Sequence, residues 1–275
     1  MLRVQTVRLT LAVTFALGAG SPALAQRKAP EGAKVFLLTG GQRQHHGYRD
    51  QAFYLAELLE NTGRYEVTMG EEAAVLETPA IRKYDLIIAN ADRRDPEFKY
   101  TKSQQQALLD YVRGGGGYVS IHAADNAAPD WLPGWRTMLG GVFSHIGLPD
   151  GKVRKGSYVV RIADRASPIT KGLDDFPLRD ELYYHMQIEP GVEPLATVEH
   201  DGTAWPIAWT RTFGQGRVFH LVLGHRDFGP GKDDPVRNPN LGRLLTQGVD
   251  WVAEGKGHPA GTGTRDAARP VTNAR

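Results

Sequence analysis

The chain has 275 residues, of which 41% are hydrophobic and 23% are charged, an ordinary composition for a globular protein. It contains no cysteine, which excludes disulfides, a catalytic thiolate and thiolate-bound metals. Lys and Arg total 33 against 31 Asp and Glu, so the chain lacks the basic footprint of a nucleic-acid-binding protein.

Residues 1–25 have the pattern of a secretory signal peptide. Arg3 and Arg8 precede an apolar run over 9–19, and the triplet ALA at 23–25 fits the small-residue cleavage site. The run is shorter than an ordinary membrane span, and no later segment reaches the length of one. We therefore expect a periplasmic or secreted protein, with a retained N-terminal anchor as the alternative.

Cleavage at this site would make Gln26 the first residue, followed by a short linker over 26–33. The leader contains two arginines and no acidic residue, so its loss leaves 31 basic and 31 acidic residues. A net charge of zero again argues against a nucleic-acid partner.

The first half of the remaining chain alternates strands with helices. Apolar runs predict buried strands at 34–39, 65–69, 84–91 and 118–121. Helices are predicted at 51–60, where apolar residues recur at helical spacing, and at 102–113, where Thr101 and Gln104 suit a capping box. This alternation predicts an α/β fold with a doubly wound, mostly parallel sheet and flanking helices.

The second half is less regular and richer in strands. Strands are predicted at 153–162 and 193–199, and Gly214-Gln215-Gly216 is typical of a hairpin turn between strands at 204–213 and 217–223. A helix over 241–253 closes a single domain that we place at 34–254. The tail 255–275, rich in Gly, Pro, Thr and Arg, is predicted to be disordered.

Five of the nine histidines follow the end of an apolar strand or a turn: His46, His122, His145, His185 and His225. Ligands bind at the carboxyl ends of strands in such sheets, so we expect several of these side chains to share one site. Imidazole transfers protons near neutral pH and binds metals, so the pattern predicts an acid/base or metal site. The alternative for each one is a hydrogen-bonded turn residue.

The other histidines and the tryptophans have plainer interpretations. His200 and His258 are predicted in exposed loops, and His220, in mid-strand, is expected to pack or to face solvent. Four tryptophans suit either the core or stacking on sugar faces: Trp131, Trp135, Trp205 and Trp209.

Several motifs give the chain a resemblance to a known family. They are TGGQRQHHGYRD, GGGGYVSIHAADN, LGGVFSH, RDELYYH, PIAWTRTFGQGRVFHLVLGH and the closing LLTQGVDWVAEG. From about Lys34 to Gly255 the chain resembles the ThuA-like (trehalose utilisation) family, which implies the flavodoxin-like fold of class I glutamine amidotransferases. Those enzymes carry a nucleophilic cysteine at the elbow where this chain has His122, so thiol-based amide hydrolysis is excluded.

The resemblance implies action on 3-keto-glycosides, sugars that a partner glycoside 3-dehydrogenase has oxidised at C3. The ketone acidifies the C2 hydrogen, so a base can remove it, the glycosidic oxygen can leave by elimination, and water can add afterwards. This route does not need the paired carboxylates of ordinary glycosidases. Two alternatives are a metal-dependent hydrolase or isomerase of another sugar derivative, and a carbohydrate-binding accessory protein without turnover.

On this hypothesis the candidate residues divide into three groups. His122 or His46 is expected to act as the base with Asp125 orienting it, and His185 with Glu181 as the acid. His145 and His225 would hold the C3 oxygen or a divalent metal, zinc or manganese, with His46 or His122 as a further ligand. The substrate contacts are expected from Trp131, Asp180, Tyr184 and Trp209.

Overall fold

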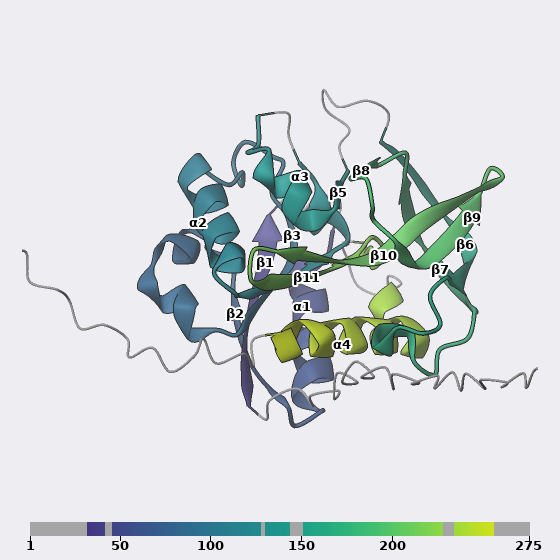
Figure 1. The fold of residues 1–275 in the computed structure, drawn as a ribbon, viewed down its shortest axis with the longest axis horizontal. Coiled ribbons are helices and arrows are strands. Elements are labelled where there is room, and N and C mark those ends of the chain that lie inside the picture. Colours follow the sequence, from purple (N-terminus) through teal and green to yellow (C-terminus); the bar gives the residue numbers. More distant parts are fainter. Residues whose placement is uncertain (1–31, 42–45, 128–129, 144–150, 228–233, 256–275) are drawn as a thin grey trace, which may run out of the picture.

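The protein is described by a computed structural model over residues 32–41, 46–127, 130–143, 151–227 and 234–255. These residues form a nine-stranded sheet with helices packed against it (Figure 1). The predicted signal peptide and nearly all of the predicted tail lie outside the described residues. Within them, no helix combines the length and the apolarity needed to cross a membrane.

The strands of the large sheet are β1 (Ala33–Gly41), β2 (Tyr65–Gly70), β3 (Leu86–Asp92), β4 (Gly117–Ile121), β6 (Lys152–Ile162), β7 (Phe176–Tyr184), β9 (Pro194–His200), β10 (Thr203–Phe213) and β11 (Gly216–Leu221). A separate short pair is formed by β5 (Gly141–Val142) and β8 (Gln187–Ile188). The α-helices are α1 (Tyr48–Glu60), α2 (Lys102–Arg113), α3 (Gly134–Leu139) and α4 (Pro239–Glu254). Short 3₁₀ helices are η1 (Ala73–Glu77), η2 (Pro79–Lys83), η3 (His122–Asp125), η4 (Pro168–Thr170) and η5 (Pro235–Arg237).

The sheet has two parts. Its order is β2-β1-β3-β4-β11-β10-β9-β6-β7. The first five strands pair in parallel and form what we call the parallel block. The last four continue it with antiparallel pairing and form the antiparallel wing. The predicted hairpin around Gly214-Gln215-Gly216 is the junction between the two parts, because β10 and β11 are its strands.

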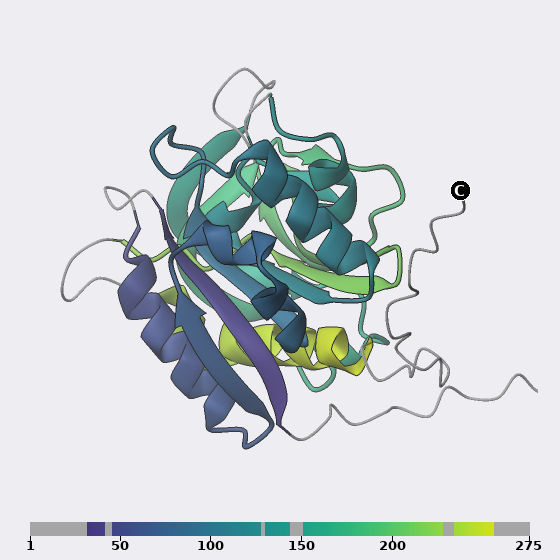
Figure 2. The same cartoon turned by 90° about the vertical axis from the view of Figure 1, so that its left-hand side faces the viewer.

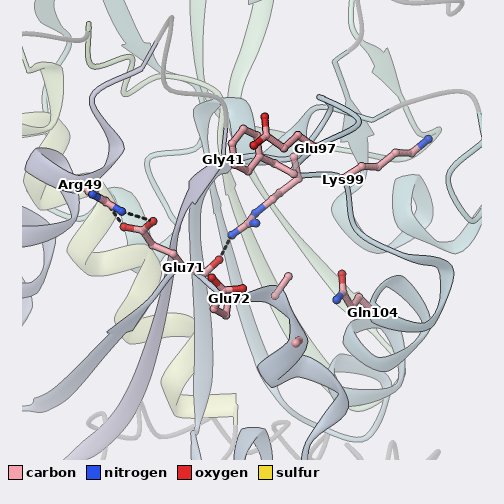
Figure 3. Close-up of a pocket in the computed structure, with 11 residues that line it drawn as sticks. Gly41, Arg49, Glu71, Glu72, Glu97, Lys99 and Gln104 are labelled. Carbon is pink, nitrogen blue, oxygen red and sulfur yellow. Dashed lines mark hydrogen bonds and ion pairs between the residues drawn. The ribbon is translucent and has the colours of Figure 1, made fainter.

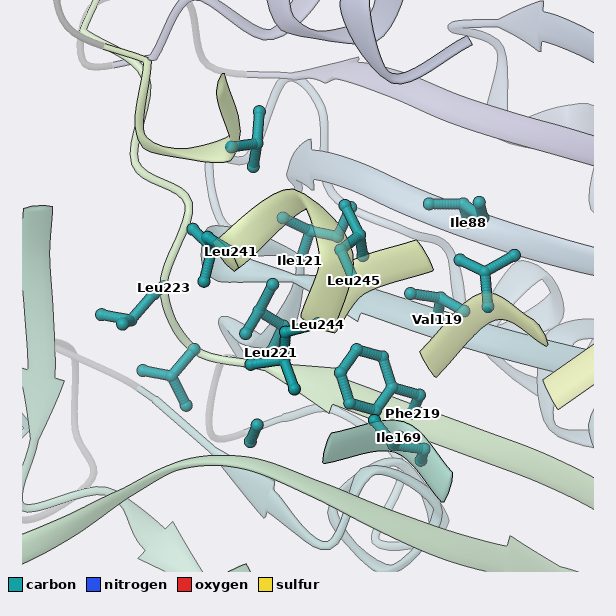
Figure 4. Packing of buried hydrophobic residues seen from close by; sticks show 14 of the residues in the cluster. Ile88, Val119, Ile121, Ile169, Phe219, Leu221, Leu223, Leu241, Leu244 and Leu245 are labelled. Carbon is teal, nitrogen blue, oxygen red and sulfur yellow. The ribbon is translucent and has the colours of Figure 1, made fainter. Parts of the chain in front are cut away.

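The near-continuous apolar runs of the parallel block are explained by cores on both of its faces. Val35 and Leu37 of β1 belong to the core that also contains α1 and α4 side chains. Phe36 and Leu38 alternate with them and belong to the second core, under α2 and α3. Figure 4 shows part of the first core, in which leucines of α4 pack on β4 and β11. Helices therefore lie on both sides of the block, as the turned view in Figure 2 shows.

Local signals in the sequence were reliable for individual elements. Thr101 and Gln104 form the predicted capping box, in which each side chain bonds the backbone N–H of the other residue at 3.1 Å. The glycine run after α2 allows a close approach, because a Cβ at Gly116 would lie 2.3 Å from the Tyr111 ring. The glycines therefore end the helix and let the chain turn tightly into β4.

The α/β class and a large sheet in which five of the nine strands, on one side, run parallel are confirmed. The prediction of a doubly wound fold is not confirmed, since the described residues contain only four α-helices and four of the nine main strands are antiparallel. The sequence indicated most strands of the antiparallel wing, but it did not indicate that they continue the same sheet as the parallel block.

Candidate functional site

Four side chains from distant parts of the chain converge at the carboxyl end of the parallel block. His46 follows β1, His122 follows β4, Glu181 belongs to β7 and His225 follows β11. One ligand atom from each lies within 4.8 Å of the other three. The three histidines are buried and the Glu181 side chain is 12% exposed. We call these four residues the histidine cluster.

Glu181 reaches the cluster because the antiparallel wing curls back toward the parallel block. Three strands separate β7 from β11 in the sheet, yet Asp180 accepts hydrogen bonds from the backbone N–H of Gly224 (2.7 Å) and of His225 (3.0 Å). Burial raises the pKa of Asp180 to about 6, against the opposing effects of His122 and of these N–H groups. Asp180, predicted to bind substrate, thus ties β7 to the segment that carries His225.

The elbow after β4 holds His122 in an uncommon conformation. Its φ of 48° lies in the left-handed region, which costs a non-glycine residue about 1–2 kcal/mol. The turn ends β4 and starts η3, and the imidazole packs on Tyr183 with ring centroids 4.2 Å apart. Strain of this kind is characteristic of functional sites, where the surrounding packing sustains it.

Hydrogen bonds fix which nitrogen of two imidazoles carries a proton. Nδ1 of His122 lies 2.8 Å from the Val222 carbonyl oxygen, and Nε2 of His225 lies 2.9 Å from Oδ1 of Asp227. Both oxygens are acceptors, so both of these nitrogens donate. The remaining two nitrogens, which then carry lone pairs, face each other at 3.0 Å.

These facing lone pairs repel one another unless a positive charge lies between them. Oε1 of Glu181 adds further negative charge, 3.3 Å from Nδ1 of His225 and 3.6 Å from Nε2 of His122. A proton on His122 or a bound cation would each remove the repulsion. Tetrahedral zinc with Zn–N bonds of about 2.0–2.1 Å separates its ligand atoms by roughly 3.3 Å, close to the spacing here.

The surroundings of His46 favour a metal ion over a proton as the positive charge within the cluster. It is 4% exposed, and neither ring nitrogen has a hydrogen-bond partner among the described residues. Its ring stacks on Tyr48 at 4.8 Å and lies 4.7 Å from the ring of His225. A buried, unpaired polar group costs about 1–3 kcal/mol, and a proton on His122 would leave that cost in place. A metal ion shared by the three histidines would satisfy it, so the residues fit a divalent cation.

The electrostatics of His46 and Glu181 agree with this donor set, whereas the raised pKa of His122 favours a proton there when no cation is bound. Burial, together with the charges of His122 and His225, holds the pKa of His46 far below its usual range, so this imidazole is neutral. Burial also opposes charge on His122, but the hydrogen bond and charge of Glu181 outweigh it and raise the pKa of His122. The same two histidines hold the pKa of Glu181 well below its usual range, although burial acts to raise it. The cluster therefore offers a neutral imidazole beside an ionised carboxylate.

A further ion pair supports the cluster from the solvent side. Nζ of Lys155 lies 2.5 Å from Oδ1 of Asp227 and 3.8 Å from Oε2 of Glu181. Metal-binding histidines commonly donate their second N–H to a carboxylate, as His225 does to Asp227. No pattern in the sequence pointed to Lys155, whereas Tyr48 could have been found from its position two residues after His46 in the motif HHGYRD.

Two predicted catalytic residues lie apart from the cluster. Asp125 does not contact the imidazole of His122 and instead pairs with His220, at 3.1 Å between Oδ2 and Nε2. Val222 provides the carbonyl that orients His122. His185 is exposed at the end of β7, in contact with the rings of Tyr184 and Trp205. The expected metal ligand His145 lies outside the described residues.

The predicted aromatic contacts occupy three different environments. Trp209 is fully buried, donates its indole N–H to the Leu139 carbonyl at 2.7 Å and stacks on His220. Trp131 packs on Trp135 under the helices of the second core. Tyr184 is half-buried on the wing beside Trp205. Trp209 and Trp131 are thus placed for packing, which was the plainer interpretation of their pattern.

A separate pocket of about 460 Å³ opens beside the ends of β1, β2 and β3 (Figure 3). Its basic groups are already engaged: Arg49 pairs with Glu71, Arg93 donates to the Thr39 and Glu71 carbonyls, and Lys99 pairs with Asp130. None of the histidine cluster lines it. Its chemistry therefore points to no particular ligand.

Residues 34–252 match the family model described as ThuA, trehalose utilisation. The chain belongs to the ThuA family. The match confirms the resemblance carried by the motifs and spans nearly the same residues. No curated protein is significantly similar to the chain in sequence.

Solved structures with the same fold include other ThuA-like proteins. One from Parabacteroides merdae is 25% identical, with a TM-score of 0.69 over 82% of this chain and 91% of that one. Another from Bacteroides uniformis is 21% identical, with a TM-score of 0.62 over 85% of this chain and 95% of that one. A β-galactosidase from Rahnella sp. R3 is 15% identical, with a TM-score of 0.51 over 82% of this chain but 31% of the enzyme, a likeness of fold alone.

Proposed function

We propose that this ThuA family member is an exported enzyme that cleaves 3-keto-glycosides at a divalent metal held in the histidine cluster. The observation that carries the proposal is the convergence of three imidazoles beside an anionic Glu181: His46 has no hydrogen-bond partner among the described residues, and the free-facing nitrogens of His122 and His225 lie 3.0 Å apart. The family description, trehalose utilisation, supports a glycoside as substrate. Export and an upstream glycoside 3-dehydrogenase rest on the leader sequence and on the chemistry of the substrate.

The three histidines are the best candidates for the metal ligands. Each has a nitrogen available, and His122 and His225 are oriented by Val222 and Asp227 through their other nitrogens. Zinc or manganese bound there would polarise the C3 carbonyl oxygen of the substrate as a Lewis acid. We therefore favour ligand roles for His46 and His122 over the base role that the sequence suggested.

Glu181 is the best candidate for proton transfer. It is the cluster residue with a window to solvent, and Lys155 approaches its outer oxygen, Oε2, at 3.8 Å. Glu181 takes the proton from C2, and the C–H electron pair becomes the C2–C3 double bond while the carbonyl oxygen becomes negative. As the C3 carbonyl re-forms, the C2–C3 electron pair moves to form a C1–C2 double bond, the glycosidic C1–O bond breaks, and its oxygen receives the proton from Glu181. Water then adds across C1 and C2, so the net reaction is hydrolysis.

The proposal is tested with the purified full-length protein and its Glu181→Gln, His225→Ala and His185→Ala variants. Metal content is measured by plasma mass spectrometry, and a 3-keto-disaccharide is incubated with each protein. We expect about one metal per chain in the wild type and in Glu181→Gln, and little in His225→Ala. Turnover should be lost in Glu181→Gln and His225→Ala and retained in His185→Ala, since His185 lies outside the cluster.

Other outcomes separate the alternatives. Metal-dependent turnover of a sugar derivative without the 3-keto group would favour a different hydrolase or isomerase. Sugar binding that persists in His225→Ala, without turnover of any substrate, would favour an accessory binding protein. A wild-type protein without metal that leaves the 3-keto-disaccharide intact would refute the proposed function.

A further inference from the structure

Arg94, an arginine next to the histidine cluster, is held rigidly by an ion pair and keeps hydrogen-bond donors that are not used. Arg94 follows β3, whose last residue, Asp92, is fully buried. Nε of Arg94 lies 3.0 Å from Oδ1 of Asp92, and Nη2 lies 2.6 Å from Oδ2. Its backbone N–H also donates to Oδ1 at 3.1 Å. The guanidinium is thus fixed by a two-pronged ion pair, the geometry in which arginine positions charge best.

The fold places this ion pair beside the cluster. β3 lies between β1 and β4 in the sheet, and its end contacts η3, which begins with His122. Nδ2 of Asn90, two residues before Asp92 on β3, donates to the Tyr48 carbonyl at 3.4 Å, and the Tyr48 ring stacks on His46 at 4.8 Å. The end of β3 that precedes Arg94 therefore borders the cluster.

Hydrogen-bond capacity remains unused there. Within the described part of the chain Nε and Nη2 of Arg94 bond Asp92 whereas Nη1 has no hydrogen-bond partner, and the side chain is 14% exposed. The hydroxyl of Tyr48 is buried and also has no hydrogen-bond partner among the described residues. A phenolic hydroxyl can donate a hydrogen bond, so this one can meet an acceptor brought by a ligand.

The neighbouring Arg93 shows what a purely structural arginine looks like in this fold. Its Nη2 donates to the Thr39 carbonyl at 2.9 Å and to the Glu71 carbonyl, which ties the ends of β1 and β2 together. Arg94 ties no strands together, because its partner Asp92 is two residues away on the same segment. Its ion pair therefore fixes the guanidinium more than it fixes the fold.

We propose that Arg94, anchored by Asp92 and assisted by the Tyr48 hydroxyl, forms an anion-binding subsite beside the histidine cluster. The ligand is a small planar oxyanion, which in the proposed reaction is the enediolate formed when the C2 proton leaves. This inference rests on the proposed function for the identity of the anion. Donors fixed before the reaction stabilise such developing charge most effectively, because they need no reorganisation.

The subsite is tested with oxalate, a planar dianion with the shape of an enediolate. Its dissociation constant is measured by titration calorimetry for metal-supplemented wild type, Arg94→Gln, Arg94→Lys and the control Arg49→Gln. Arg49 also forms a two-pronged pair with a carboxylate, Glu71, but lies in the separate pocket. We expect at least a tenfold weaker affinity in Arg94→Gln, a smaller loss in Arg94→Lys, which keeps the charge without the fork, and less than a twofold change in Arg49→Gln.

Metal content and thermal unfolding are recorded for each variant to detect loss of folding. If Arg94→Gln does not fold, the test rests on Arg94→Lys. Unchanged oxalate affinity in Arg94→Gln, no oxalate binding by the wild type, or an equal loss in Arg49→Gln would overturn the subsite. Arg94-dependent oxalate binding by a protein that leaves 3-keto-glycosides intact would support the subsite and refute the proposed function. Full turnover of 3-keto-glycosides by Arg94→Gln would support the proposed function and refute the subsite.

Discussion

Two histidine–carboxylate pairs lie close together near the end of β11, and they differ in what surrounds the second imidazole nitrogen. His220 pairs with Asp125 at 3.1 Å and His225 with Asp227 at 2.9 Å. Nδ1 of His225 meets His122 and Glu181, whereas Nδ1 of His220 has no partner among the described residues and its ring stacks on Trp209 at 4.1 Å. A histidine–carboxylate pair alone therefore does not indicate a functional site. The indication is that the second nitrogen of the imidazole meets other potential metal ligands.

The carboxylates differ as well. Burial raises the pKa of Asp125, even though His220 acts to lower it. Burial of Asp227 is outweighed by its hydrogen bonds to Lys155 and His225, so its pKa is lowered. Asp227 thus remains an anion, which would strengthen His225 as a ligand in the proposed metal site, whereas Asp125 belongs to the packing of the core.

The largest expected effect is on the free energy of unfolding, and it should differ between the two histidine–carboxylate pairs. Asp125→Ala should cost about 3–5 kcal/mol of the free energy of unfolding, because it breaks a fully buried pair and leaves His220 unsatisfied. Asp227→Ala should cost less than about 1 kcal/mol in metal-free protein, since the Asp227 side chain is 40% exposed. Urea denaturation with a chelator present measures both, and equal losses would remove the distinction.

The next effect concerns metal affinity. His225→Ala should weaken metal binding by more than about 100-fold, beyond the range of an outer contact, because a ligand is removed. His220→Ala is the matched control, a buried histidine on β11, the strand that His225 follows, and should bind metal as the wild type does. Competition with a chromophoric chelator gives both affinities. A comparable loss in folded His220→Ala would show that the two histidines belong to one site.

A smaller effect is expected where only the orientation of a ligand changes. Asp227→Asn should weaken metal binding by about 10–100-fold, since the charged acceptor that fixes His225 becomes a neutral amide. Asp175→Asn, in an ion pair with Arg161 on the wing, should leave the affinity unchanged. The same chelator competition measures these affinities. A wild-type metal affinity in Asp227→Asn would show that Asp227 does not orient His225 for metal binding.

The smallest effect calibrates the others. Thr101→Ala removes half of the capping box of α2 and should cost about 1 kcal/mol of unfolding free energy, with metal affinity unchanged. Thermal unfolding and metal titration of the same sample measure the two quantities. A change in metal affinity would mean that the cluster responds to any loss of stability, which would weaken the comparison of the two pairs.

The sequence was most informative where structure is local. The capping box at Thr101 and the apolar strands of the parallel block follow from short-range patterns, and the rule that ligands bind at strand ends correctly grouped His46, His122 and His225. Sequence proximity misled for Asp125: it lies three residues after His122, but η3 directs it toward His220, a residue expected only to pack or face solvent.

The contribution of the wing could not be read from the sequence. Asp180, Glu181 and His185 lie close together in the motif RDELYYH and were expected to share the site. Asp180 instead fastens the curled wing, Glu181 enters the cluster and His185 remains exposed. These outcomes depend on how the wing bends back over three strands, a long-range property that no local pattern encodes.

The position of β11 has a consequence for how the molecule is made. This strand sits in the middle of the sheet, between β4 and β10, yet only the short segment with η5 and the helix α4 follow it among the described elements. Until residues 216–221 emerge during synthesis, β4 has an open edge and the chain lacks His225. Open strand edges promote aggregation of incomplete chains. Metal uptake by the cluster would therefore report that synthesis has passed His225, because a chain interrupted before that residue lacks one of the proposed ligands.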